Sequence, residues 1–264
     1  MISDGMADVL RSLRLGGAGD PARACARALG AEGVALSLLI GDERTAEPLW
    51  CHPELSARFE ELQFTLGEGP GPDAARAGSP VVEPDLDRVR PERWPALLPA
   101  AREMGVHGVC CFPLGIGAIR VGVLTVLYDG DRRMSVQQYV DATALAAALT
   151  GAFLNADQRA IRNGVEDGAR LGMFLERPSG LLRAVVHQAT GMVSVQLGVS
   201  MEEALLRLRG HAYGSERLLG EVAEDVVARR LRFNDDFDNG FNNGLDDGFD
   251  DDKSGPYSPD GGKG

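Results

Sequence analysis

Apolar residues follow two different spacings in the first half of the chain. Continuous or alternating apolar runs predict strands at residues 33–40, 48–51, 79–83, 106–114 and 119–127. Apolar residues spaced three or four positions apart predict helices between them, at residues 1–15, 21–29, 53–62 and 94–104. A glycine and proline stretch at 66–73 predicts a loop that leads into a helical turn. Helices interleaved with strands and hairpin turns predict an α+β domain on a mainly antiparallel sheet, flanked by helices.

The spacing becomes purely helical after about residue 135. Ala142, Leu145, Leu149 and Phe153 recur at helical steps and give a long helix with one apolar side. Such a helix either leaves the domain as a stalk that pairs in a dimer or packs on its own sheet, and the pattern allows both. Glycines then interrupt the helix, and residues 178–180 (Pro-Ser-Gly) mark a boundary.

Three short helices are predicted beyond this boundary. Each carries one apolar stripe, and Ser200 followed by Glu203 is typical of a capping box at the start of the second. We therefore expect five parts: an N-terminal helix (1–16), a sheet domain (17–156), a helical linker (157–182), a three-helix module (183–233) and an acidic tail (234–264).

The three-helix module and the tail differ in net charge. The chain has a net charge of −12, but residues 234–264 hold nine acidic residues and two lysines, which leaves −5 for the rest. Residues 183–233 carry seven arginines against six acidic residues, so this module is slightly cationic. The tail is low in complexity, with Asp, Asn and Gly around isolated phenylalanines, and we predict it to be disordered. An EF-hand alignment on Gly240 fails because Phe237 falls at an oxygen-ligand position.

No motif points to an enzyme. The sequence lacks a GxSxG elbow, an HExxH pair and a phosphate-binding loop, and its four histidines form no metal-ligand pattern, so we expect no catalytic residue, metal or cofactor. The four cysteines lack CxxC spacing, and no export signal or membrane span is apparent. We expect a cytoplasmic protein with reduced cysteines.

Residues 186–227 resemble an ANTAR domain. The matching positions are Ala189, Gly191, Ser200, Ala204, Leu208, Arg209, Ala212, Leu219, Val222 and Ala223. The resemblance implies a three-helix RNA-binding module, often dimeric, that binds paired stem-loops in nascent transcripts and so prevents terminator formation. One departure is Thr190, which stands where the family has lysine.

The module contains six candidate RNA-binding residues. Arg209 and Arg217 are candidates for phosphate or loop-base contacts, although arginines on a small helical module are solvated surface by default. Polar or aromatic groups beside the motif are candidates for reading unstacked bases: Gln188, Thr190, His211 and Tyr213. Tyr213 equally suits a position that closes the core.

The first domain is similar to GAF domains. The resemblance rests on residues 66–86, Trp94-Pro95, Gly105-Val106, 112–114 and 122–124. Relatives with this GAF–ANTAR arrangement, familiar from actinobacteria, often have cysteine where this chain has Gly71. The resemblance implies a sensor or dimerisation domain, with a small-molecule ligand under the 66–73 loop or a filled core without one. Candidate lining residues are Phe64, Trp94, Cys110 and Phe112.

Two functions follow from these observations. The first is an RNA-binding transcription antitermination regulator, a homodimer in which the GAF-like domain controls the ANTAR-like module. The second is a protein-interaction adaptor whose three helices bind a protein partner. The acidic tail and Thr190 favour the second, and the arginine content of the module favours the first.

Overall fold

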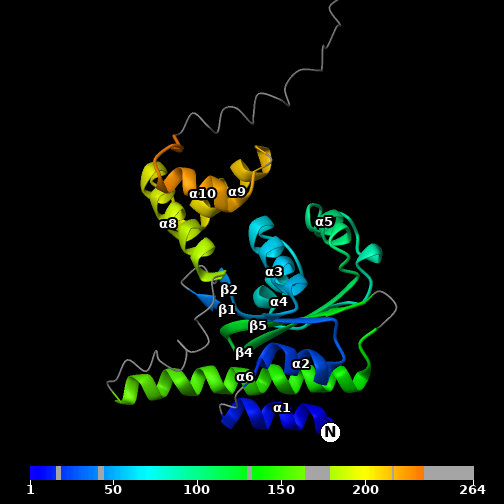
Figure 1. The fold of residues 1–264 in the computed structure, drawn as a ribbon. Coiled ribbons are helices and arrows are strands. Elements are labelled where there is room, and N and C mark those ends of the chain that lie inside the picture. The colour runs from blue at the N-terminus through cyan, green and yellow to red at the C-terminus, as the bar shows by residue number, and fades with distance from the viewer. Residues whose placement is uncertain (16–18, 41–44, 130–132, 164–178, 216, 235–264) are drawn as a thin grey trace, which may run out of the picture.

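A computed structural model of the chain describes residues 1–15, 19–40, 45–129, 133–163, 179–215 and 217–234 (Figure 1). The predicted acidic tail lies outside these residues except for Asn234, and so does most of the predicted linker. The described part divides into a sheet domain, from α1 to α6, and a helical bundle, from α8 to α10.

The sheet has five strands in the order β2-β1-β5-β4-β3, and all neighbours are antiparallel. The strands are β1 (Gly33–Ile40), β2 (Thr45–His52), β3 (Val81–Glu83), β4 (Gly108–Ile116) and β5 (Ile119–Tyr128). The predicted α+β class with an antiparallel sheet is confirmed. β4 and β5 are buried on both faces for most of their length, which explains why they appear in the sequence as continuous apolar runs.

Helices cover both faces of the sheet (Figure 1). One face packs against α2 (Pro21–Leu29) and α6 (Val136–Asn163), and α1 (Asp4–Leu15) packs outside these two helices. The other face packs against α3 (Glu54–Leu66) and α4 (Pro70–Ala77), and α5 (Leu97–Glu103) packs against α3. Successive residues of β4 alternate between the faces: Cys110 and Phe112 join the first core, whereas Val109 and Cys111 join the second.

The structure corrects one sequence prediction in this domain and decides between two arrangements that the sequence left open. The stretch at 66–73 is mostly helical, because α3 continues to Leu66 and α4 begins at Pro70, a residue whose fixed φ suits the first turn. The long helix α6 packs on its own sheet: Ala142, Leu145 and Leu149 are buried in the first core. Of the two arrangements that the helical pattern allowed, the described part of α6 therefore shows the packed one.

The helical bundle consists of α8 (Ser179–Leu197), α9 (Met201–Gly214) and α10 (Leu219–Val227). The predicted stripes form its core, including Val186, Leu208 and Val222. The Ser200 hydroxyl accepts a hydrogen bond from the Glu203 amide at 3.1 Å, as the capping pattern predicted. The Glu203 carboxylate is used differently, since it pairs with Arg207 at 2.8 Å.

None of the described helices is both long and apolar enough to cross a membrane.

Candidate nucleic-acid interface and its contact with the sheet domain

The bundle exposes only part of the predicted RNA-binding set. Gln188 is exposed on α8, and Tyr213 is 72% exposed at the end of α9. Thr190 is only 1% exposed, and its hydroxyl donates to the Val186 carbonyl at 2.8 Å. A contact between Thr190 and an RNA phosphate is therefore incompatible with this structure, because this hydroxyl is enclosed by the bundle core.

Arg209 points toward the sheet domain. Its guanidinium lies 5.3 Å from the ring centre of Phe64, a residue of α3. A Cβ placed on Gly67 would lie 2.9 Å from Arg209 Nη1, so the two domains meet closely here. In this arrangement Arg209 contributes to the domain contact.

His211 lies in the last turn of α9, and Arg217 lies just beyond the end of this helix. The His211 ring packs edge-on against Phe233 at 5.5 Å, and burial followed by the charge of Arg217 lowers the pKa of His211. Arg217 is exposed but pairs with Asp225 at 2.7 Å and with Glu221 at 4.0 Å. An RNA phosphate would have to compete with these carboxylates for Arg217.

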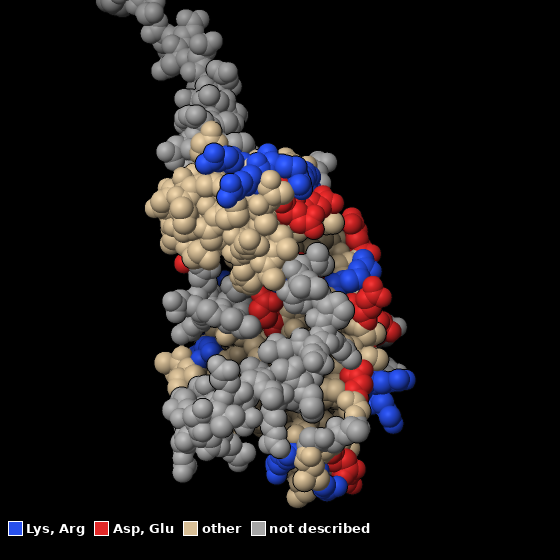
Figure 2. All heavy atoms as spheres, turned by 60° about the vertical axis from the view of Figure 1, so that its left-hand side comes forward, with Lys and Arg blue, Asp and Glu red and all other residues tan. Residues whose placement is uncertain are grey.

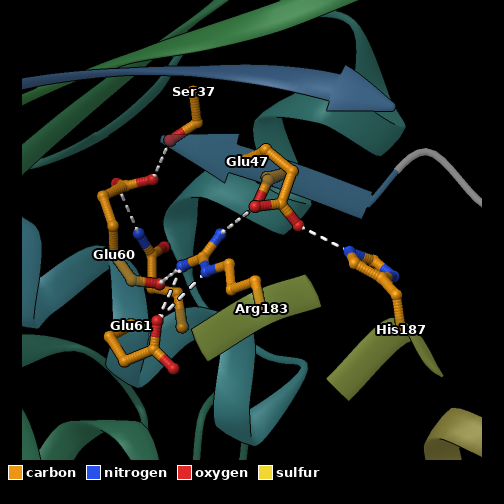
Figure 3. Close-up of polar contacts among 8 residues, drawn as sticks. Ser37, Glu47, Glu60, Glu61, Arg183 and His187 are labelled. Atoms are coloured by element: carbon orange, nitrogen blue, oxygen red, sulfur yellow. Dashed lines mark hydrogen bonds and ion pairs between the residues drawn. The ribbon is translucent and has the colours of Figure 1, made fainter. Parts of the chain in front are cut away.

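A buried arginine, Arg183, fixes the start of α8 on the sheet domain (Figure 3). Its side chain is 3% exposed, and its Nη2 lies 3.0 Å from the Glu61 carboxylate. The same guanidinium donates to the backbone carbonyls of Ala46 and Glu60 and lies 4.3 Å from the centre of the Phe64 ring. These contacts with a carboxylate, two carbonyls and an aromatic ring together compensate for the loss of hydration of the buried guanidinium.

Glu47 extends this contact along α8 (Figure 3). Its carboxylate lies 3.7 Å from Arg183 and 2.7 Å from His187 Nε2, one turn further along the helix. Glu47 belongs to β2 and Glu61 to α3, so two elements of the sheet domain hold the same helix. This contact was not predicted from the sequence. Its one visible signal is that Arg183 is the one Lys, Arg, Asp or Glu residue in the sequence of α8.

A series of buried hydrogen bonds lies beneath the contact. The Ser37 hydroxyl donates to Glu60, Gln63 donates to the same carboxylate at 3.1 Å, and the Gly71 amide donates to Gln63 at 2.7 Å. Beside it is a cavity of about 380 Å³ with a wall from each domain, including Phe64 and Ala75 on one side and Leu205 and Arg209 on the other.

The predicted ligand-lining residues of the first domain are not brought together. Phe64 lines this cavity, but Trp94 lies in the core between the sheet and α5, where its indole donates to Asp73 at 3.2 Å. Cys110 and Phe112 lie on the opposite face of the sheet. The prediction of one site lined by all four is wrong, because Cys110 and Phe112 face the α2 and α6 side of the sheet, whereas Phe64 and Trp94 lie on the α3 side.

Burial in the core disfavours the thiolate form of Cys110 and Cys111. Burial, followed by the charge of Glu83, raises the pKa of Cys110 to about 12, and burial also raises the pKa of Cys111. The described residues contain no cluster of His, Cys, Asp and Glu that would hold a metal ion.

Comparisons with known proteins identify the bundle. Residues 182–227 match the family model of the ANTAR domain. A search of curated proteins found no match to the chain.

Solved structures resemble part of the chain at low identity. The GAF domain from a phosphoenolpyruvate-protein phosphotransferase of Coxiella burnetii is 16% identical with a TM-score of 0.44, covering 60% of this chain and 99% of that one. The GAF domain of the Acinetobacter phosphoenolpyruvate-protein phosphotransferase is 15% identical with a TM-score of 0.44, covering 60% and 97%. A domain of a two-component sensor histidine kinase from Sinorhizobium meliloti 1021 is 18% identical with a TM-score of 0.43, covering 53% and 91%.

Proposed function

We propose that this chain, whose residues 182–227 form an ANTAR domain, is an RNA-binding regulator of transcription antitermination. The match between that family and a complete three-helix bundle is the observation that carries the proposal. ANTAR domains are RNA-binding output domains, so the bundle binds stem-loops in nascent transcripts and the GAF-like sheet domain acts as its sensor. The protein works in the cytoplasm as a homodimer, without catalytic activity of its own.

The contact between the domains supports a sensor that controls its output. Arg183 and His187 of the bundle bind carboxylates of the sheet domain, and Arg209 forms part of a cavity that both domains line. A small molecule that enters this cavity changes the contact and with it the presentation of the bundle. Gln188, Tyr213 and Arg217 remain candidates for RNA contact because they are exposed.

A gel-shift titration of the full chain tests this function. The probe is a synthetic RNA with two consecutive stem-loops, and the comparison is a linear RNA of the same composition. We expect the stem-loop RNA to bind more tightly, with an affinity that falls as salt rises, since phosphate contacts release counterions. Equal binding to unrelated hairpins and to linear RNA would contradict the proposal.

A protein-interaction adaptor is the second candidate. Exposed apolar side chains on the bundle favour it, among them Val195 at 84%, Leu206 at 60% and Leu218 at 70% exposure. A protein partner that co-purifies after nuclease treatment, from a chain that binds no stem-loop RNA, would establish this alternative.

A further inference from the structure

A groove runs along the exposed side of α8, and the part of its lining that α8 supplies is uncharged. Gln188, Gly191, Met192 and Val195 line it, and their spacing of three, four and seven residues places them on one face of the helix. The groove encloses about 680 Å³, and every residue that lines it belongs to the bundle. No acidic side chain is among those residues.

The middle of the groove is open because α8 carries a glycine there. A Cβ built on Gly191 would meet no atom within 4 Å, and its neighbour along the stripe, Val195, is 84% exposed. Glycine weakens a helix interior, yet here it leaves a stretch of helix surface that a flat group can approach.

Two arginines form the rim of this groove. Arg229 and Arg232 follow the end of α10, and both are exposed. Arg229 has a φ of 60°, a left-handed conformation that costs a non-glycine residue about 1 kcal/mol. This backbone reversal brings the segment back to α8, where the Phe233 amide donates to Gln196 at 2.9 Å.

Among the described residues, Arg230 pairs with a carboxylate, whereas Arg229 and Arg232 do not. Arg230 pairs with Asp225 at 2.7 Å, a carboxylate that also binds Arg217. Within the described part of the chain, neither Arg229 nor Arg232 has a carboxylate within 4 Å. Figure 2 shows basic side chains grouped at the end of the bundle beside a broad uncharged surface, with acidic groups on one flank.

We propose that this groove is where the bundle binds RNA. Arg229 and Arg232 bind backbone phosphates, and unstacked loop nucleotides lie on the stripe from Gln188 to Val195, with the Gln188 amide available to a base edge. The inference rests on the proposed function, and it places the RNA contacts on the surface between α8 and the end of α10 instead of on α9. Arg183 and Arg209 face the sheet domain instead, so the groove stays accessible while the two domains are in contact.

The test uses the full chain and the same two-stem-loop RNA. The Arg229→Ala/Arg232→Ala variant removes two phosphate contacts, so we expect a loss of affinity of tenfold or more and a plot of log affinity against log salt that is shallower by about two. Arg11→Ala/Arg14→Ala is the control, because it removes the same charge from two exposed arginines of α1. We expect that control to bind nearly as the unmodified chain does.

A second pair of variants keeps both arginines. Gly191→Glu places a carboxylate in the groove, and a Cβ at this position would meet no atom within 4 Å. It should weaken RNA binding by about tenfold or more through repulsion of phosphate, whereas Gly191→Gln, of the same shape, should bind more tightly than Gly191→Glu.

The outcomes separate the two proposals. If the unmodified chain binds the stem-loop RNA and all four variants match it, the groove is not the RNA site, although the proposed function stands. If the unmodified chain does not bind this RNA, the proposed function itself fails. Unchanged RNA binding with a loss of dimer in Gly191→Glu would identify the groove as a surface for a second copy and overturn the inference.

Discussion

Arginines of the bundle occupy three distinct environments. Arg183 is buried and surrounded by carboxylate and carbonyl oxygens of another domain, Arg230 is exposed but paired with Asp225, and Arg232 is exposed at the groove rim. A guanidinium group therefore serves as an interdomain contact at Arg183 and as an ion pair at Arg230, and at Arg232 it is the proposed phosphate ligand. The groups that surround each arginine in the folded structure distinguish these roles, and the sequence alone does not show those groups.

Replacement of Arg183 should loosen α8 from the sheet domain. Arg183→Met keeps much of the side-chain volume but removes the charge, leaving Glu61 and two backbone carbonyls without their donor. We expect a loss of about 2–3 kcal/mol in the stability of this contact, measured as faster amide hydrogen exchange in residues 184–197.

Arg207→Met is the matched control for this substitution. Arg207 makes an i,i+4 pair with Glu203 on a partly exposed face, where such pairs contribute about 0.3–0.5 kcal/mol. Equal effects of the two substitutions on hydrogen exchange in α8 would contradict the role given to Arg183.

His211 should make the bundle sensitive to mild acid. Burial first, and then the charge of Arg217, lowers the pKa of this imidazole below its ordinary value of 6.5. The folded bundle therefore binds a proton less readily than the unfolded chain does. Stability is full above pH 6.5, falls as the pH drops from 6.5 to the lower folded value, and then levels off.

The measurement is the urea midpoint of the bundle transition between about pH 8 and pH 5. His211→Gln should flatten part of the acid-side decline, whereas His107→Gln, at an exposed position of the sheet domain, should leave the decline in place. The prediction fails if His211→Gln and the unmodified chain lose stability in parallel.

At the scale of elements, two glycines have opposite structural requirements. Gly191 lies within α8 with open space around it, so Gly191→Ala should stabilise the bundle by about 0.5–1 kcal/mol. Gly67 ends α3 with a φ of 69°, and a Cβ there would lie 2.9 Å from Arg209. Gly67→Ala should therefore destabilise by about 1 kcal/mol or more, and thermal unfolding of both variants measures the contrast. Shifts of the same sign would contradict it.

The elements themselves were largely predictable, because each has a local cause. The strands β1, β4 and β5 follow from apolar runs, and the start of α9 follows from Ser200 and the position of Glu203. α4 was predicted only as a helical turn after a loop, because its prolines and glycines are typical of loops, although Pro70 fits the first turn of a helix.

The candidate site was less predictable, because accessibility depends on how the domains meet. Arg209 fits the family pattern and Thr190 stands at the position of the family's lysine. Thr190 is nevertheless enclosed in the bundle, and Arg209 faces Phe64. The partners of Arg183 lie more than a hundred residues away, and nothing in the local pattern of Glu47 or Glu61 sets them apart from solvated acidic residues.

The whole molecule combines a contact between domains with a groove that points away from it. Carboxylates of β2 and α3 hold the start of α8, and the exposed face of the same helix carries Gln188 and Val195. A signal that alters the contact can thus reposition the groove without changing its chemistry. Control of RNA binding would then act through the placement of two bundles in a dimer, since affinity for paired stem-loops depends on simultaneous engagement.

Reversal of one charge in the domain contact tests whether that contact and the RNA-binding groove are separate. Glu61→Lys places a cation beside Arg183 and should drive the bundle away from the sheet domain, which small-angle scattering detects as a larger radius of gyration. Binding of one isolated stem-loop should stay near that of the unmodified chain, because the groove lies outside the contact, whereas binding of two consecutive stem-loops should weaken. Glu54→Lys, at an exposed position of the same helix, is the control for added positive charge. If Glu61→Lys weakens binding to one stem-loop as much as to two, the domain contact and the RNA site are not separate.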